Sequence, residues 1–596
     1  MKQRMTDWLM GRLADEGINN VFFVPGAGCM YLVDALAKSE RITPISMHHE
    51  QAAGMAAITY AKCNEKLGAC VVTTGCGGTN AITACLHAWQ DNVPCVFISG
   101  QAARNQTVRN ASVPLRQFGR QEADIISIVE PITKYAVMLN DPQTVMGEVE
   151  KALYIAQHGR KGPVWIDVPA DIQNAIVNTE KQIPVPFKKE RVYYLDKDSK
   201  AYVIDAFKSA QRPVLLVGNG VRLANGMDVL KQFVDKIQIP VVWSRLGQDL
   251  LEPDDPLAIG MSGMLGTTRA GNFALQNADL VLCVGCRLSI NTTGYEYQKF
   301  AREAKLVVVD IDRNEHSKQT VKIDKFIKAD AFHFFRQLLD SDLSEVNPEW
   351  RNKCTEWKNN YKPVDIPQSR DEFINTYDFI DALSDVLPDN ATVISDAGST
   401  YYITSSSIRV SRKRNQRSIT SAAQAEMGYS LPASIGAAYA RNGLVVAMSG
   451  DGSLMMNIQE LETLAYRQPN VKLCVLNNNG YSSIRYSHKP LFGDRVIGTD
   501  PSCGLGLPDF EKIANAFGLK YVKISKKENL KKQIEEVLAM DGAVFCDIIC
   551  TPVQEFLHVN VGKNQNGRFE FRPLEDQAPF LDREIIKNEM IINPLL

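Results

Sequence analysis

Two short polar segments in the second half of the chain have the residue types and the spacing of a metal site. The first is Gly450-Asp451-Gly452-Ser453, and the second is Asn477-Asn478-Asn479-Gly480-Tyr481. Asp451 can supply a carboxylate oxygen, Asn478 an amide oxygen and Gly480 a backbone carbonyl. Hard oxygen ligands of this kind, completed by phosphate oxygens, are what Mg²⁺ prefers. The glycines let the backbone approach a diphosphate closely. The two segments together predict a magnesium site that anchors a diphosphate.

Taken alone, a Gly-Asp-Gly tripeptide has a simpler interpretation, because it is most often an ordinary turn between a strand and a helix. Here both segments directly follow apolar runs, Val445–Ser449 and Lys472–Leu476, that predict strands. Ligands of parallel sheets bind at the carboxyl ends of the strands. Two polar turns at the same edge of one sheet therefore favour the metal site over two unrelated turns.

A third candidate is Glu50, which opens a run of small residues, 52–57, that predicts a helix. A carboxylate in the first turn of a helix is favoured by the helix dipole, so Glu50 could be only a capping group. His48 and His49 precede it and could bind a substrate, but they could equally cap the helix or pack.

The composition of the whole chain is that of a globular protein. The 596 residues are 45% hydrophobic and 22% charged, with a net charge of -2. That length predicts about three to four domains. The balanced charge argues against a nucleic-acid partner, and no apolar stretch is long enough to span a bilayer. The start of the chain lacks an apolar signal core, so we expect a cytoplasmic protein without a membrane partner.

The thirteen cysteines are scattered along the chain, which is typical of buried thiols in a reducing compartment. Cys283 and Cys286 have the C-x-x-C spacing of a metal or redox site, but no second pair completes it. The pair follows an apolar run, so we interpret it as the end of a strand.

Apolar strand-like runs alternate with helical patterns in three blocks, followed by a different tail. We place the blocks at 1–183, 195–345 and 371–553, with polar connectors near 184 and at 346–370, and the tail at 554–596. Such alternation predicts the α/β class, with doubly wound, mostly parallel sheets covered on both faces. The tail is polar with a few apolar anchors, and two alternatives are open for it: an ordered arm that packs across the body or over a cleft, and a disordered segment.

In this combination the chain resembles thiamine-diphosphate (ThDP) enzymes, and most closely acetolactate synthase and its relatives. The resemblance covers nearly all of residues 1 to 553, in the same order. Besides the segments above, it is carried by five motifs: Val24–Gly28, Thr73–Asn80, Gly162–Pro169, Asp396–Ser399 and Met427–Pro432. It implies three domains of the ThDP-enzyme fold, which are pyrimidine-binding, central and diphosphate-binding.

The resemblance also implies roles for individual residues. Glu50 would hydrogen-bond N1′ of the cofactor's aminopyrimidine and so promote loss of the thiazolium proton, while Met427 would enforce the bent cofactor shape; core packing is the alternative for Met427. Asp451, Asn478 and Gly480 would hold Mg²⁺. The residues implied to contact ThDP are Gly26, Ala27, Glu50, Thr74, Asn80, Ala397, Gly398, Ser399, Met427, Gly450, Asp451, Gly452, Ser453, Asn478, Gly480 and Tyr481.

For the central block the resemblance implies bound FAD. Gly218-x-Gly220 after a strand is a weak nucleotide signal by itself. The further segments that resemble flavin contacts contain Met264, Gly266, Thr267, Arg287 and Asp310. The alternative is a central domain of the same framework that binds no nucleotide.

Two departures from acetolactate synthase fall on the acceptor side. Asn291 stands where the family has an arginine that grips the second 2-keto acid, and an amide cannot replace a bidentate guanidinium. Ser487, followed by His488, stands where the family has a tryptophan. Arg485 is expected beside them. On the donor side, where the 2-keto acid that is decarboxylated would bind, Gln121 matches the family. Gln121, His49 or His48 would position this 2-keto acid.

We therefore expect a ThDP- and Mg²⁺-dependent carboligase that decarboxylates pyruvate or a close 2-keto acid. It would transfer the acyl unit to a carbonyl acceptor larger or more polar than pyruvate, such as a keto-sugar. The alternatives are acetolactate synthase itself, with the acceptor carboxylate held by Arg120 or Arg485, a 2-keto acid decarboxylase, a flavin-dependent pyruvate oxidase, and a non-catalytic subunit. The resemblance implies a homodimer or homotetramer in which Glu50 meets Asp451 of another subunit.

Overall fold

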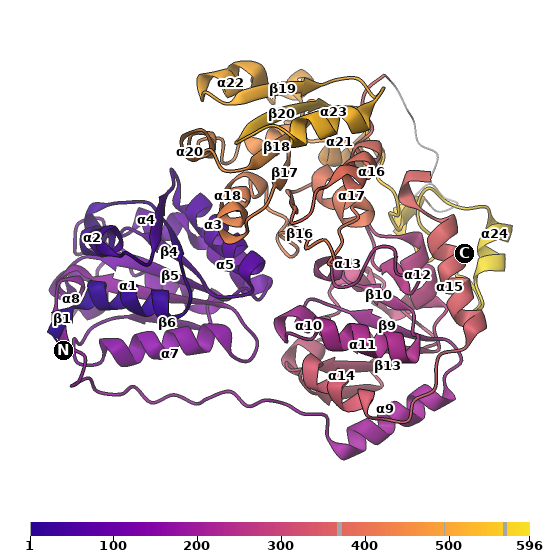
Figure 1. Ribbon diagram of the computed structural model, residues 1–596, viewed down its shortest axis with the longest axis horizontal. Helices are drawn as coiled ribbons and strands as arrows, with labels where there is room; N and C mark the ends of the chain where they lie inside the picture. The colour runs from indigo at the N-terminus through magenta and orange to yellow at the C-terminus, as the bar shows by residue number, and fades with distance from the viewer. Residues whose placement is uncertain (1, 366–371, 494, 564–568, 596) are drawn as a thin grey trace.

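Three parallel six-stranded sheets dominate the computed structural model, which describes residues 2–365, 372–493, 495–563 and 569–595. In Figure 1 the N-terminal sheet lies to the left, the C-terminal sheet at the top and the central sheet at the lower right. The α/β class and the mostly parallel sheets predicted from the sequence are confirmed. No helix among the described residues is long and apolar enough to cross a membrane.

The N-terminal sheet is covered by helices on both faces. One face carries α1 (Met5–Asp15), α2 (Met30–Lys38) and α7 (Val145–Gln157), and the other carries α3 (Glu50–Asn64) and α5 (Ile82–Gln90). Across the sheet the strands follow the order β3 (Thr43–Ser46), β2 (Asn20–Phe23), β4 (Gly68–Val72), β5 (Cys95–Gln101), β7 (Pro163–Pro169) and β6 (Tyr135–Met138).

The C-terminal sheet repeats the same strand order, which is second, first, third, fourth, sixth and fifth along its own segment. Its strands are β16 (Arg417–Thr420), β15 (Thr392–Ser395), β17 (Val445–Gly450), β18 (Val471–Asn477), β20 (Val544–Ile549) and β19 (Lys520–Ile524). The helices that matter for the site are α17 (Ser399–Ser407), α18 (Ser430–Ala440), α20 (Glu460–Arg467) and α21 (Ser482–Phe492).

Helices α3 and α18 join these two sheets into one hydrophobic core. The core runs from Phe22 in the N-terminal sheet, through the alanines of α3, to Phe545 in the C-terminal sheet. The contact is close because both helices present small residues: a Cβ added at Gly436 would lie 2.1 Å from the Ala56 carbonyl oxygen. The N-terminal end of α3, where Glu50 sits, is therefore fixed against the C-terminal block.

The central sheet has a different strand order, third, second, first, fourth, fifth and sixth, which is that of dinucleotide-binding folds. Its strands are β11 (Ala258–Met261), β10 (Val241–Trp243), β9 (Pro213–Val217), β12 (Leu280–Val284), β13 (Lys305–Asp310) and β14 (Lys325–Lys328). All residues of β9 and β12 are buried, as expected for strands covered on both faces. The reversal of strand order falls between β9 and β12.

The connector at 346–370 differs from the polar linker expected there. It contains helix α15 (Pro348–Asn360), whose Trp350, Cys354 and Trp357 side chains are buried in the core of the central sheet. Its end, and the expected boundary at 371, lie outside the described residues.

The described part of the tail is an ordered arm on the central block (Figure 1, yellow). Strand β21 (Val561–Lys563) pairs with β22 (Phe569–Phe571), and helix α24 (Arg583–Glu589) follows. Leu574, Ile586 and Met590 join the central core. The ordered alternative for the tail is therefore the correct one for these residues. All thirteen cysteines are unpaired, and Cys283 lies within a strand as interpreted.

Candidate active site

The predicted metal segments lie side by side at the carboxyl edge of the C-terminal sheet. Strands β17 and β18 are parallel neighbours, with Gly450 paired to Leu476, so both turns leave the sheet at the same level. One oxygen of Asp451, Oδ2, accepts hydrogen bonds from the backbone N–H groups of Asn478, at 3.1 Å, and Gly480, at 2.8 Å. The structure thus brings together the three residues that the sequence proposed as metal ligands.

The oxygen atoms of this cluster fit a cation. The amide of Asn478 donates to the Ser482 hydroxyl at 3.1 Å, while its Oδ1 is buried without a hydrogen-bond partner among the described residues. Burial raises the pKa of Asp451 to about 6. The hydrogen bonds from the backbone N–H groups of Gly480, Gly452 and Asn478 lower this pKa, but burial outweighs them. A buried carboxylate next to an unsatisfied amide oxygen is a costly arrangement, which a bound Mg²⁺ would relieve.

Gly480 can only be glycine in this loop. Its φ is +117°, and a Cβ would lie 2.1 Å from the Thr499 carbonyl oxygen. Its own carbonyl accepts from the Ser482 N–H at 3.0 Å. Since a carbonyl oxygen has two lone pairs, this one keeps a second for a ligand.

Arg485 holds the loop rather than a substrate. Its guanidinium, on α21, donates to the carbonyl oxygens of Asn478 (2.8 Å), Asn479 (2.9 Å), Pro552 (3.1 Å) and Thr499 (3.2 Å). Its donors are therefore used by the backbone around the proposed ligands. This differs from the expectation that Arg485 lines the acceptor side, and spacing alone gave no sign of the role because the partners lie in three separate segments.

Asp396 connects the remaining segments expected to contact the cofactor. Its carboxylate accepts from the backbone N–H of Ala397 (2.9 Å) and from the hydroxyls of Ser449 (2.8 Å) and Ser430 (3.1 Å). In addition, Gly428 N–H donates to the Ser453 hydroxyl at 3.1 Å. The segments 397–399, 427–430 and 449–453 are thus assembled around one buried carboxylate. Asp396 was not among the predicted contacts, although it begins one of the motifs.

The N-terminal candidates gather around Glu50. Its carboxylate accepts from the Asn80 side chain at 2.9 Å and is only 9% exposed. A Cβ added at Gly77 would lie 3.4 Å from Glu50 Oε1, and one added at Gly75 would lie 1.9 Å from the backbone oxygen of Gln121. The glycine loop, Glu50 and Gln121 therefore share one corner of the sheet.

Three further predicted contacts, Gly26, Ala27 and Thr74, belong to the same corner. A Cβ added at Gly26 would lie 2.5 Å from the side chain of Thr73, and Gly28 N–H donates to the Thr73 hydroxyl at 3.1 Å. Thr74 turns its hydroxyl toward the Gly100 carbonyl, at 3.0 Å. Ala27 lies between the two glycines in a short 3₁₀ turn. The glycine loop at 24–28 thus packs directly on the glycine loop at 73–80.

The histidines before Glu50 have structural partners. His49 is the N-cap of α3, and its Nδ1 accepts from the Gln51 N–H at 3.1 Å. The backbone N–H groups of His48 and His49 both donate to the Glu460 carboxylate, at 3.0 and 3.1 Å. The capping alternative therefore describes His49 better than the catalytic one.

Within one chain, no hydrogen bond or ion pair joins the Glu50 carboxylate to Asp451 among the residues that the structure describes. Asn457 of the C-terminal block donates to the side chain of Gln51, the neighbour of Glu50 (3.2 Å), and to the Gly428 carbonyl (2.9 Å). The meeting of Glu50 with Asp451 of a partner subunit stays a prediction.

The central block borders a cavity at the point where its strand order reverses. Among its lining residues are Asn219, Gly220, Arg287, Asn291 and Asp310. The wall opposite comes from the N-terminal block and includes Asp91 and Arg160. Three of the residues predicted for a flavin, Gly220, Arg287 and Asp310, therefore line one cavity.

Four other residues predicted for the flavin are not among those that line this cavity. Gly218 packs on Gly285, whose carbonyl oxygen lies 2.3 Å from an added Cβ, and Gly266 packs on the backbone of Tyr402. Met264 and Thr267 lie under the arm, since the Met264 carbonyl accepts from Asn560 N–H (3.2 Å) and the Thr267 carbonyl pairs with His558 Nδ1 (2.6 Å). The arm therefore accounts for the difference at Met264 and Thr267, while Gly218 and Gly266 are covered by Gly285 and Tyr402.

The residues expected on the acceptor side are spread over two regions. Asn291 lines the central cavity. Ser487 lies on α21, exposed, with its hydroxyl donating to the Ile484 carbonyl at 3.1 Å. His488 packs its ring 5.5 Å from that of Phe492.

Comparison with known proteins agrees with this arrangement. Three family descriptions match: "Thiamine pyrophosphate enzyme, N-terminal TPP binding domain" over residues 3–125, "central domain" over 201–338, and "C-terminal TPP binding domain" over 396–548. The chain is 31% identical over 541 residues to the acetolactate synthase isozyme 1 large subunit of Escherichia coli, covering 90% of this chain and 92% of the relative.

Two further relatives have similar coverage. The isozyme 2 large subunit of E. coli is 30% identical over 579 residues, which cover 94% of this chain and 96% of that protein. The probable acetolactate synthase large subunit of Methanocaldococcus jannaschii is 31% identical over 564 residues, or 91% of each chain. The matched domains, the order of the motifs and the identity over almost the whole length leave one conclusion: this chain belongs to the acetolactate synthase family of thiamine-diphosphate-dependent enzymes.

Proposed function

We propose that this chain is a Mg²⁺-dependent carboligase that decarboxylates pyruvate, or a close 2-keto acid, and joins the retained acyl unit to a carbonyl acceptor. The observation that carries the proposal is the buried Asp451 carboxylate beside the unsatisfied Asn478 Oδ1 at the edge of a sheet. With the Gly480 carbonyl, these oxygens would hold a Mg²⁺ ion that binds the cofactor diphosphate.

When bound, ThDP supplies the carbon nucleophile of the reaction. Glu50 is suited to exchange a proton with the aminopyrimidine N1′, because Asn80 orients its carboxylate without neutralising it. Met427, 37% exposed, would offer an apolar side chain to the cofactor, and the next residue, Gly428, donates its N–H to the hydroxyl of Ser453 in the metal turn. The backbone of Gln121 packs on Gly75, in the same corner as Glu50, and Gln121 is the candidate that would orient the 2-keto acid.

A second 2-keto acid is the first acceptor to test, which would make the product acetolactate. Supporting this proposal, the relatives named above are called acetolactate synthase large subunits. The acceptor carboxylate would then need a cation other than Arg485, whose donors are used by four backbone carbonyls. Arg120, which is exposed beside Gln121, is the candidate.

A different acceptor, larger or more polar than pyruvate, is the second candidate function. It is favoured by Asn291 in place of the expected arginine and by the exposed Ser487 in place of a tryptophan. An amide and a hydroxyl suit hydroxyl groups of a keto-sugar better than a free carboxylate.

We also propose that FAD occupies the central cavity. The cavity lies at the carboxyl ends of β9 and β12, where dinucleotides bind in sheets of this strand order. Arg287 and Arg160, from opposite walls, would face the diphosphate of such a ligand. The three blocks, at 1–183, 195–345 and 371–553, would be the pyrimidine-binding, central and diphosphate-binding domains of a dimer or tetramer.

One experiment separates the two acceptors. The purified protein, supplied with ThDP, Mg²⁺ and FAD, is incubated with pyruvate alone and with pyruvate plus keto-sugars, sugar nucleotides or aldehydes, and CO₂ release and products are followed by mass spectrometry. Acetolactate formed rapidly from pyruvate alone supports the first candidate. CO₂ release that requires an added carbonyl compound supports the second. The absence of any ThDP-dependent pyruvate consumption would overturn both.

A further inference from the structure

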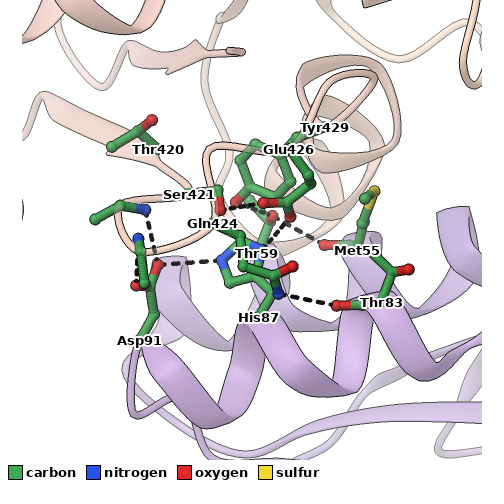
Figure 2. Close-up of polar contacts among 12 residues, drawn as sticks. Met55, Thr59, Thr83, His87, Asp91, Thr420, Ser421, Gln424, Glu426 and Tyr429 are labelled. Atoms are coloured by element: carbon green, nitrogen blue, oxygen red, sulfur yellow. Dashed lines mark hydrogen bonds and ion pairs between the residues drawn. The ribbon is translucent and has the colours of Figure 1, made fainter.

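A buried group of charged side chains, distant from the metal turn, joins the N-terminal block to the segment that precedes Met427. We call it the His87 cluster: Lys62, His87, Asp91, Ser421 and Glu426. Figure 2 shows the His87 ring on α5 facing the Glu426 and Ser421 side chains of the loop above it. His87 and Asp91 are almost completely buried.

The pair at the centre of the cluster is His87 and Glu426. His87 Nδ1 lies 2.5 Å from Glu426 Oε1, and the Ser421 hydroxyl donates to the other carboxylate oxygen. Removing one partner of such a buried pair leaves the other charge uncompensated, which is strongly unfavourable. Glu426 is therefore held firmly in this position.

On the other side of the ring, Asp91 caps the same loop. Its carboxylate accepts from the backbone N–H groups of Ala422 (3.0 Å) and Ala423 (3.1 Å). Lys62, from α3, donates to Asp91 (2.8 Å) and to the Thr420 carbonyl (2.9 Å), and its Nζ lies 2.8 Å from His87 Nε2. The groups that face His87 are thus Lys62 from α3, Asp91 at the end of α5, and Glu426 and the Tyr429 ring from the loop side.

Five residues of the loop, Thr420, Ala422, Ala423, Gln424 and Glu426, are anchored to α3 or to α5 and its cap Asp91, and Ala425 among them has a strained backbone. Gln424 donates to the Thr83 carbonyl at 3.2 Å. Ala425, between Gln424 and Glu426, has φ of +48°, a left-handed conformation that is unfavourable for an L-residue with a Cβ. Such a conformation persists when the surrounding contacts over-determine it. Met427 follows immediately, so its position depends on contacts made by the N-terminal block.

We propose that His87 and Glu426 are positioning residues for the cofactor: their buried pair holds the loop 420–428 and thereby sets the place of the Met427 side chain. This inference rests on the proposed function, because Met427 is assigned to ThDP only there. The pair couples the two cofactor-binding blocks, since His87 belongs to the block of Glu50 and Glu426 to the block of Asp451.

The test compares two buried carboxylates that both bridge blocks of the chain. Glu426→Gln keeps the shape of the side chain but removes the charge that pairs with His87. The matched control is Glu252→Gln: Glu252 is buried and accepts from the Ser411 hydroxyl (2.7 Å) and the Lys413 N–H (2.9 Å), across a different contact between blocks. For both variants and the wild type, the dissociation constant of ThDP at saturating Mg²⁺ is measured by fluorescence titration, together with kcat and KM for pyruvate.

We expect Glu426→Gln to weaken ThDP binding about tenfold, the size of one lost charge-assisted contact, while Glu252→Gln binds ThDP like the wild type. KM for pyruvate at saturating ThDP should not change. Equal ThDP affinities in all three proteins, or equal weakening in both variants, would overturn the inference and leave the proposed function standing. A wild-type protein that binds no ThDP would overturn the proposed function and this inference with it.

A second variant covers the case in which Glu426→Gln does not fold. Ser421→Ala removes one hydrogen bond to Glu426 without leaving a buried charge unpaired. It should weaken ThDP binding in the same direction, by about threefold to tenfold. Wild-type affinity in a folded Ser421→Ala protein would contradict the positioning role.

Discussion

The N-terminal and C-terminal sheets have the same strand order, yet they hold their carboxylates differently. Glu50 follows the second strand of its sheet, and one oxygen accepts from a side-chain amide, that of Asn80. Asp451 follows the third strand, and three backbone N–H groups surround it, those of Gly452, Asn478 and Gly480. One carboxylate is oriented by a side chain and the other is enclosed by the main chain.

This difference suits two different chemical tasks. A carboxylate held by a single amide keeps lone pairs for a proton partner, as a proton-exchanging group requires. A carboxylate fixed by backbone N–H groups has a constant position, as a metal ligand requires. In the proposed function the same framework would serve both ends of a bound cofactor, with the task decided by the loops rather than by the strand order.

Among the tests of the different roles of the two carboxylates, a substitution of Glu50 has the largest expected effect. Glu50→Gln keeps the contact with Asn80 but cannot exchange a proton, so kcat for pyruvate consumption should fall by about 10²–10⁴-fold. Binding of ThDP should change little, because the cofactor diphosphate is held elsewhere. Steady-state kinetics and a ThDP titration measure the two quantities. A large loss of ThDP affinity with kcat retained would reverse the roles assigned to the two sheets.

Asp451→Asn tests the other carboxylate. Since affinity for hard cations depends on the charge of the ligands, we expect Mg²⁺ affinity, measured through Mg²⁺-dependent ThDP binding, to fall roughly 100-fold. Asp547→Asn is the control. Asp547 lies on the neighbouring strand β20 and accepts from Asn477 (3.1 Å) and Tyr521 (2.9 Å), but is no proposed ligand. Equal effects in the two variants would speak against a specific metal site.

Arg485→Lys tests whether the main chain around Asp451 needs the hydrogen bonds from the Arg485 guanidinium to keep its shape. A lysine cannot reach four carbonyl oxygens with a planar fork, so the loop 478–480 should loosen. We expect a loss of about 1–3 kcal/mol in the free energy of unfolding and about tenfold weaker Mg²⁺ binding. Thermal unfolding with and without Mg²⁺ measures both. Unchanged Mg²⁺ affinity would mean that the loop holds its shape without the guanidinium.

The smallest expected effect is a pH dependence of the contact between the two blocks. Burial alone would lower the pKa of His87, but the Glu426 and Asp91 carboxylates outweigh burial and the Lys62 charge and raise it. A histidine pKa raised by folding means that its stabilisation is complete below the unfolded value, about 6.5, and is lost as pH rises through the folded value.

The stability difference between wild type and Glu426→Gln should therefore be largest near about pH 6 and shrink toward about pH 9. Unfolding temperatures of both proteins across this range provide the measurement. A difference that stays constant with pH would show that His87 does not carry the charge of the pair.

Much of the fold and of the cofactor site could be predicted from local patterns. The strand ends before Asp451 and Asn478, and the helix that begins at Glu50, lie where the apolar runs and small residues indicated. The arm over Met264 and Thr267 could not be predicted, nor could the support given by Arg485 and Asp396, because their partners lie in separate segments of the chain.

Local sequence patterns were enough to predict the three α/β blocks, the glycine turns and the residue types of the proposed metal cluster. These follow from periodicity and turn chemistry, which act over a few neighbouring residues. The packing of distant segments was needed to find that His49 caps a helix, that Arg485 holds the loop 478–480 and that His87 is buried against Glu426. Such pairings depend on which helices pack face to face, and that is set by the shared core of the two sheets, not by spacing along the chain.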